Sequence, residues 1–446
     1  MVTTAQVESA LGRGRSTIRD RVRGSHLARN STLIMASTVI NGVLGVVYWM
    51  LVGHGYSTDT IGVASALLQA ITLASLVATF GLGQTLIQRL PHADDATWST
   101  SVNGVVFGGF LSGAMAGVLS LLVLPHISHR FDVILHPAFA VLVVLGTAAL
   151  TVANLFDYVF IGQRAAHYVL IRAGVFGVLK LAIVAVPLLF LDFGVAGVVG
   201  SWVVAAAGTS LITSKWLLPG LGRRHRWSPR GVAADLRSIA PQMLRNHLIS
   251  LSATALPTLM PTLVVARSSA ETNAYFYMAW LVSSILLTVS AAVSGSLLAE
   301  GSYDPGLLGK QVRHAALLIA GLLVVPTGVL WLAGRPIMHL FGAQYAAHSY
   351  VLVLVFMLVL IPDAVTNIYV TVCRVRRQTG VAAAVNITGS AVALVGAWFL
   401  VPQHGAIGAV WGWILGQAAG TVVVASHLAY QRLRRLGTVD SGATTS

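Results

Sequence analysis

Twelve runs of apolar residues, each about 20 residues long and therefore long enough to cross the hydrocarbon of a bilayer as a helix, follow one another along this chain. Within lipid, backbone groups can satisfy their hydrogen bonds only in helices or closed barrels. Charged residues make up 9% of the chain and hydrophobic residues 56%, which excludes a water-soluble fold. We therefore expect an all-α polytopic membrane protein whose transmembrane helices lie at residues 31–53, 61–81, 101–124, 138–161, 169–191, 195–217, 247–266, 274–298, 315–333, 350–373, 381–400 and 407–429.

The basic residues predict which way the chain faces. Most of the 28 Lys and Arg residues lie in the N-terminal segment, in the even-numbered connections or in the C-terminal tail. The odd-numbered connections contain Arg130, Arg267 and Arg335 alone. Because basic connections stay on the cytoplasmic side, both termini are expected to be cytoplasmic, in the inner (plasma) membrane of the cell.

Two segments of the chain are near copies of each other. Residues 194–202 read GVAGVVGSW and residues 405–413 read GAIGAVWGW. The stretch 57–60 also matches 269–272, before the second and the eighth run. Each half contains six runs, so both halves enter the membrane from the same side. This pattern predicts a parallel duplication, with two six-helix lobes in a V-shaped arrangement.

A second pair of matching residues sets the alignment of the two halves within the fourth and tenth runs. Arg164 follows the fourth run as Arg374 follows the tenth, an offset that places Asp157 opposite Asn367.

The domain organisation follows from the duplication. The longest connection between runs falls after the sixth run and carries six Arg residues, which indicates the linker between the lobes. We expect a cytoplasmic Arg-rich segment at 1–30, an N-lobe at 31–218, a basic cytoplasmic linker at 219–246, a C-lobe at 247–430 and a cytoplasmic tail at 431–446.

Two cations lie within the fifth run. An ionisable residue at the centre of a transmembrane helix costs at least about 2.5–3.5 kcal/mol, so each needs a partner or an aqueous cavity. Lys180 lies near the midplane and is expected to line a polar cavity. Arg172, about two helical turns earlier, either lines the same cavity or extends to the cytoplasmic interface.

Two acids also lie within runs, Asp157 in the fourth and Asp363 in the tenth. Each could carry a coupling ion. A buried ion pair that stabilises its lobe is the alternative, and Asp157 could pair with Lys180 or Arg172. Pro362 frees a helix carbonyl beside Asp363, which favours a functional role there.

Amide side chains at depth form a third group of candidates. Hydrogen bonds between helices are the default expectation for each such group, and Asn41, Gln69 and Asn386 are also candidate cavity residues for binding substrate. The sequence contains no recognisable catalytic, metal-binding or nucleotide-binding motif. We therefore expect no enzymatic activity, cofactor or metal, and no nucleic-acid partner.

Several short motifs resemble those of a known superfamily. They are His54–Gly62 between the first two runs, Phe80–Gly83 after the second, Leu298–Gly301 after the eighth and Phe341–Tyr345 before the tenth. In their order and spacing the chain resembles the multidrug/oligosaccharidyl-lipid/polysaccharide (MOP) exporters, and most closely their polysaccharide-flippase branch.

The resemblance implies an alternating-access flippase for a lipid-linked oligosaccharide. Its cargo would be a glycan on a polyprenyl phosphate, moved from the inner to the outer leaflet for polysaccharide synthesis at the cell surface. Arg172 and Lys180 would hold the phosphates. Membrane lipids and polysaccharide-assembly proteins are the other partners expected, and the protein is expected to be a monomer. A cation-coupled multidrug antiporter of the MATE type is the alternative.

Overall fold

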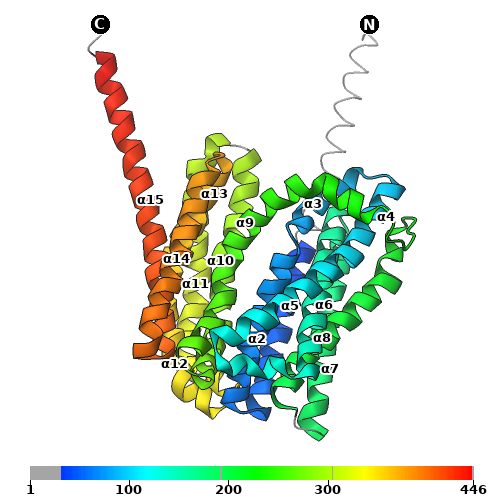
Figure 1. Ribbon diagram of the computed structural model, residues 1–446. Helices are drawn as coiled ribbons and strands as arrows, with labels where there is room; N and C mark the ends of the chain where they lie inside the picture. The colour runs from blue at the N-terminus through cyan, green and yellow to red at the C-terminus, as the bar shows by residue number, and fades with distance from the viewer. Residues whose placement is uncertain (1–31, 191–192, 304, 444–446) are drawn as a thin grey trace, which may run out of the picture.

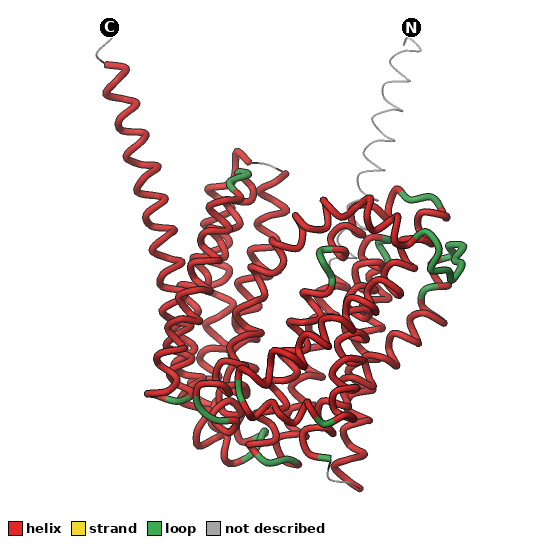
Figure 2. The backbone as a smooth tube through the Cα atoms, viewed as in Figure 1, coloured by secondary structure: helices red, strands yellow, loops and turns green. Residues whose placement is uncertain are grey.

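The computed structural model describes residues 32–190, 193–303 and 305–443, and within these ranges the chain consists of helices joined by short loops and turns (Figure 2). The first half comprises a helix at Thr32–Gly55, α2 (Thr58–Ala78), α3 (Leu82–Arg89), α4 (Asp95–Asn103), α5 (Gly109–Ile127), α6 (Pro137–Gly162), α7 (Ala166–Phe190) and α8 (Gly194–Ile212). The second half comprises α9 (Val232–Arg267), α10 (Ala270–Tyr303), α11 (Leu308–His339), α12 (Ala343–Phe356), α13 (Leu360–Val375), α14 (Thr379–His404) and α15 (Ala406–Ala443).

Eleven helices in the described part of the chain are long and apolar enough to cross a membrane. They coincide with eleven of the twelve expected runs. The remaining run, 247–266, lies within α9, whose described apolar part is the shorter stretch Leu256–Arg267. A short π-helical turn joins α4 to α5, and a 3-10 turn joins α12 to α13, so each pair forms one continuous crossing.

Two of the expected connecting segments contain helix that was not predicted from the sequence. Residues 219–246 were expected to form a linker, but α9 already begins at Val232. The last connection before it is the loop 222–231. The expected tail 431–446 is also helical as far as Ala443, because α15 continues without a break.

The duplication seen in the sequence is repeated in the helix caps. Ser57 Oγ accepts a hydrogen bond from the Thr60 amide at 3.3 Å, at the start of α2. Ser269 Oγ accepts one from the Thr272 amide at 3.0 Å, at the start of α10. Both hydroxyls thus satisfy an amide that the first helical turn leaves free. The two copies therefore begin their second crossing with the same cap.

The caps also correct the alignment between the lobes. Arg164 and Arg377 both adopt left-handed φ angles, 56° and 60°, at the ends of α6 and α13. The structural counterpart of Arg164 is therefore Arg377 and not Arg374. The resulting offset of 213 residues places Asn154 opposite Asn367.

The helices form two bundles that converge at one end and separate toward the end where both chain termini lie (Figure 1). One bundle contains α2 to α8 and the other contains α10 to α15. Helix α9 begins beside the first bundle and crosses to the second. Its Asp235 accepts two hydrogen bonds from the Arg89 guanidinium of α3, at 2.6 and 3.1 Å, which ties the start of α9 to the N-lobe.

The lobes meet closely at the end away from the termini. Asn273 Nδ2 of α10 donates to the carbonyl of Gly62 at 2.8 Å and to Ser65 Oγ at 3.0 Å, both in α2. A Cβ atom on Gly62 would lie 1.7 Å from the carbonyl oxygen of Ala270. Only glycine permits this approach of the two helix backbones.

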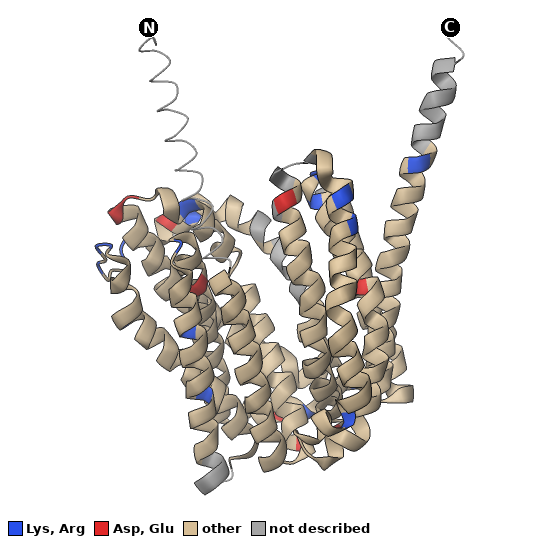
Figure 3. Cartoon of the chain, turned by 180° about the vertical axis from the view of Figure 1, so that it is seen from behind, with Lys and Arg blue, Asp and Glu red and all other residues tan. Residues whose placement is uncertain are grey.

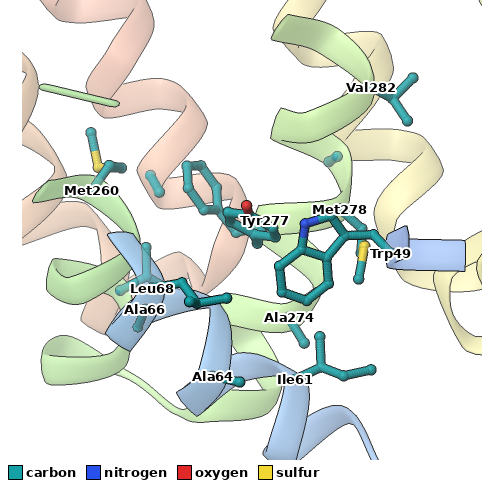
Figure 4. Packing of buried hydrophobic residues seen from close by; sticks show 14 of the residues in the cluster. Trp49, Ile61, Ala64, Ala66, Leu68, Met260, Ala274, Tyr277, Met278 and Val282 are labelled. Carbon is teal, nitrogen blue, oxygen red and sulfur yellow. The ribbon is translucent and has the colours of Figure 1, made fainter. Parts of the chain in front are cut away.

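Aromatic packing extends this contact into the interior of the molecule. The rings of Trp49 and Tyr277 meet edge to face with their centroids 4.8 Å apart. Around them, Ile61 and Leu68 of α2 pack with Met260 of α9 and other side chains of α10 in one buried cluster (Figure 4). Apolar residues from both lobes therefore seal this end.

The contact predicts the effect of one methyl group. Gly62→Ala should force the lobes apart and lower the thermal unfolding midpoint of the purified protein. Gly45→Ala is the matched control, because no heavy atom lies within 4 Å of the position that its Cβ would occupy. Alanine is favoured over glycine in a helix by about 1 kcal/mol, so the control should be neutral or stabilising. Equal midpoints for the two variants would show that the Gly62 contact does not hold the lobes together.

Candidate functional site

The N-lobe encloses a polar cavity of about 530 Å³ between the first helix, α2, α6, α7 and α8. Arg172 and Asp157 meet in its wall. Arg172 Nη1 lies 2.6 Å from Asp157 Oδ1, and Arg172 Nη2 donates to the carbonyl of Ala153 at 2.7 Å. Arg172 is 5% exposed, whereas the Asp157 side chain is 39% exposed. The pair leaves the carboxylate accessible and the guanidinium enclosed.

Amide and hydroxyl groups line the rest of this cavity. Asn41, a candidate from the sequence, is exposed on the first helix and lines the cavity. Asn154 Nδ2 donates to Ser75 Oγ at 3.2 Å. Thr209 Oγ1 is buried and has no hydrogen-bond partner among the described residues. The wall can therefore donate to and accept from a polyhydroxylated ligand.

Lys180 does not line this cavity. It is 2% exposed, and its ammonium lies 4.6, 5.2 and 5.4 Å from the ring centroids of Trp202, Phe176 and Tyr48. No ion pair among the described residues includes it. Each cation–π contact contributes about 0.5–2 kcal/mol, so three rings can offset an insertion cost of about 2.5–3.5 kcal/mol. The expectation of a polar cavity around Lys180 is wrong, because rings of two neighbouring helices enclose the charge.

The C-lobe holds a second polar cavity, of about 210 Å³, between α9, α10, α13, α14 and α15. Asp363 lies in its wall, 8% exposed, and its Oδ2 atom has no hydrogen-bond partner among the described residues. Thr366 Oγ1 donates to Gln417 Oε1 at 3.1 Å, and Asn386 faces the same space. A buried carboxylate oxygen without a partner is costly, so this cavity is suited to a cation or a proton.

The corrected alignment shows that the two lobes have ionisable side chains at different equivalent positions. Asp157 of the N-lobe corresponds to Val370, and Arg172 corresponds to Val385. Both valines belong to one buried apolar cluster. Asp363 corresponds in turn to Leu150, which lines the N-lobe cavity. The N-lobe thus has an ion pair where the C-lobe has an apolar contact, and the C-lobe has an acid where the N-lobe has leucine.

Gln69 lies outside both cavities. Its Nε2 atom donates to the Tyr277 hydroxyl at 3.3 Å, across the contact between the lobes. The sequence also gave no reason to select Ser283 and Ser294 of α10, whose buried hydroxyls have no partner among the described residues. The hydroxyl of a serine in a transmembrane helix commonly donates a hydrogen bond to a carbonyl of the same helix. The sequence therefore does not distinguish a serine whose hydroxyl is unpaired. Among the described residues, no three His, Cys, Asp or Glu side chains gather as a metal site would require.

The Lys and Arg residues are distributed unequally between the two ends of the molecule, as expected. Most Lys and Arg of the described chain lie at the end where the termini are, and a few lie at the opposite end (Figure 3). At the termini end, the loop before α9 is held on α4, where Asn103 Nδ2 donates to the Arg226 carbonyl at 2.9 Å.

Known structures with the same architecture cover nearly the whole chain. An inward-facing multidrug resistance MATE family transporter of the MOP superfamily matches with a TM-score of 0.65 and 14% identity, over 90% of this chain and 99% of its own. The lipid II flippase MurJ in an inward closed conformation matches with a TM-score of 0.68 and 12% identity, over 89% and 87%. An outward-facing MATE transporter of the superfamily gives 0.58 at 14% identity, over 92% and 96%.

No family model and no curated protein matches the chain in sequence. At identities of 12–14% the structural likeness shows the fold. The chain therefore has the fold of MOP-superfamily transporters, and the fold class expected from the sequence is confirmed.

The ion pair of the N-lobe corresponds to two valines in the C-lobe, and this difference predicts a compensating pair of substitutions. Asp157→Val should leave the enclosed Arg172 without a counter-ion and destabilise the protein by about 3–5 kcal/mol. Arg172→Val should cost less, because the remaining carboxylate is already accessible. The double variant, which copies the valine pair of the C-lobe, should recover most of the loss. Thermal unfolding of the four proteins gives the coupling, and strictly additive effects would refute it.

Proposed function

We propose that this protein is an alternating-access flippase that moves a lipid-linked oligosaccharide from the inner to the outer leaflet of the plasma membrane, for polysaccharide synthesis at the cell surface. Such a cargo combines sugars and phosphates with a long isoprenoid chain. The headgroup cannot cross about 30 Å of hydrocarbon unaided. A protein that carries it needs a polar interior and an apolar lateral surface next to each other.

An apolar groove at the junction of the lobes is the observation that carries the proposal. Its volume is about 400 Å³, and it lies between the first helix of the N-lobe and helices α10 and α11 of the C-lobe. Every lining residue is apolar: Val46, Met50, Val282, Ile285, Leu286, Val325, Pro326, Val329, Leu330, Ile337 and Phe341. Such a groove suits a hydrocarbon chain that stays in lipid while its headgroup moves between the lobes.

The N-lobe cavity supplies the polar counterpart. Asn41, Asn154 and the accessible carboxylate of Asp157 can form hydrogen bonds with sugar hydroxyls. Arg172 lines the cavity but already binds Asp157, and Lys180 is enclosed by rings. In this conformation we therefore assign the sugars to the N-lobe cavity and leave the phosphates without a contact from either cation.

Asp363 is the better of the two candidates for a coupling ion. Asp157 is neutralised by Arg172, whereas Asp363 has a free buried oxygen in a cavity with three amide side chains, Asn367, Asn386 and Gln417. A cation or proton there would relieve the cost of the buried charge. Export of a phosphate is also driven by a membrane potential that is negative inside, by about 2.3 kcal/mol per charge per 100 mV.

The charge asymmetry supports the direction of transport. Under the positive-inside rule the termini are cytoplasmic, so the separated ends of the lobes face the cytoplasm. The closed end sealed by Trp49 and Tyr277 then faces outward. This conformation would admit cargo from the inner leaflet.

Reconstituted protein tests the proposal. In proteoliposomes, the wild type should move a fluorescent polyprenyl-pyrophosphate-linked oligosaccharide between leaflets, measured by loss of fluorescence to an impermeant quencher. With an inward gradient of protons or of sodium, Asp363→Asn should reduce the gradient-dependent part of the rate at least tenfold. Asp59→Asn is the control, because Asp59 is an exposed acid that pairs with Arg130 outside both cavities.

The same vesicles distinguish the flippase from the alternative, a drug antiporter. A gradient that drives efflux of an organic cation dye, with no movement of the glycolipid, would replace the flippase proposal with a MATE-type antiporter. Movement of the glycolipid alone would support the flippase.

A further inference from the structure

A third polar cavity lies in the C-lobe, toward the end where the termini are. It measures about 320 Å³ and lies between α10, α13 and α14. Its polar lining consists of Ser294, Asn367, Thr371, Arg374 and Asn386. Asn367 and Asn386 also line the cavity of Asp363, so the two spaces share a wall.

The buried groups of this cavity need a ligand. Ser294 is 5% exposed, and its hydroxyl has no hydrogen-bond partner among the described residues. Thr371 is equally buried. Buried polar groups in native proteins are nearly always paired, and an unpaired one at a cavity wall indicates a missing partner. Water or a polar ligand must therefore occupy the space.

Arg374 determines the charge of that ligand. It is exposed in the last turn of α13, and no ion pair among the described residues includes it. A guanidinium offers five N–H donors and accepts nothing. The hydroxyls of Ser294 and Thr371 and the amides of Asn367 and Asn386 complete the polar lining. Planar, forked donors of this kind are suited to oxyanions, above all phosphate.

The position of the cavity suits a phosphate that enters from the membrane surface. Arg374 lies seven residues beyond Asn367 on α13, about two helical turns nearer the end of the lobe where the termini lie. Under the proposed topology this is the cytoplasmic end, where lipid phosphates lie. Arg172 and Lys180, the cations expected to hold phosphates, are both engaged within the N-lobe. Arg374 is therefore an exposed cation without an ion-pair partner among the described residues, which neither Arg172 nor Lys180 is.

We propose that Arg374, Ser294 and Thr371 form a phosphate-binding site in the C-lobe. The inference rests on the proposed function where it identifies the ligand as the pyrophosphate of the lipid-linked cargo. The chemistry is shared with a phospholipid headgroup, which is a phosphodiester. The nearby carboxylate of Asp363 opposes an anion, so neutralising Asp363 should strengthen the site.

Binding to the purified full-length protein tests the site. The probes are inorganic pyrophosphate, geranyl pyrophosphate and a short-chain phosphatidylglycerol, titrated by isothermal calorimetry at low and at high salt. Arg374→Gln should weaken binding of geranyl pyrophosphate at least tenfold, and Ser294→Ala should weaken it several-fold. Asp363→Asn should strengthen it. Arg376→Gln is the matched control, an exposed arginine two residues away that does not line the cavity, and it should leave affinity within twofold.

The outcomes separate the possibilities. Equal affinities for Arg374→Gln and Arg376→Gln, with unchanged thermal unfolding midpoints, would overturn the site, as would no binding of any probe by the wild type. Tighter binding of geranyl pyrophosphate than of phosphatidylglycerol supports the cargo as ligand, whereas the reverse order assigns the site to a phospholipid. Arg374-dependent binding without glycolipid movement in vesicles would refute the proposed function and leave the phosphate site intact. Glycolipid movement without Arg374-dependent binding would do the opposite.

Discussion

Every charge inside this bundle has to be neutralised, enclosed or opened to water, because hydrocarbon offers it nothing. The four ionisable residues expected at depth meet this constraint in three ways. Arg172 pairs with Asp157, Lys180 lies among three aromatic rings, and Asp363 faces a cavity with one oxygen unpaired. In the first two arrangements a counter-ion or aromatic rings offset the charge, although Arg172 Nε has no hydrogen-bond partner among the described residues. The third leaves a carboxylate oxygen unpaired at a cavity wall, and it is there that we propose the coupling site.

The lobes are copies in backbone and differ in the chemistry they carry. The same serine caps, and left-handed residues at matching positions, fix the helices of both halves. On this shared frame an ion pair in one lobe replaces a valine contact in the other. A stable N-lobe and a C-lobe that takes up ions would let one half serve as a frame while the other responds to its ligand. The close contact at Gly62 joins them at the end away from the termini.

Much of the fold could be predicted from the sequence, because apolar run length and charge asymmetry report directly on the bilayer. Asn41, Arg172, Asp363 and Asn386, all candidates from the sequence, line cavities, and their roles in binding substrate or a coupling ion stay predictions. The surroundings of Lys180 could not be predicted, since Tyr48 and Trp202 reach it from other helices. The alignment error arose because three arginines, Arg374, Arg376 and Arg377, lie close together at the end of α13, and only the backbone conformation shows which one matches Arg164. The unpaired hydroxyls of α10 could not be predicted either, because the absence of a hydrogen-bond partner depends on how the helices pack.

Alternating access requires the two lobes to rock about their closed end, so that a headgroup can pass through the membrane. The most direct test is to measure distances between spin labels at Asp95 and Arg376, in opposite lobes at the termini end, with a second pair across the closed end. Cys373, the single cysteine, would first be replaced by serine. Alternating access predicts that a lipid-linked oligosaccharide shortens the first distance and lengthens the second, with both states populated. Two distances that stay fixed with and without cargo, in protein that binds it, would contradict the account.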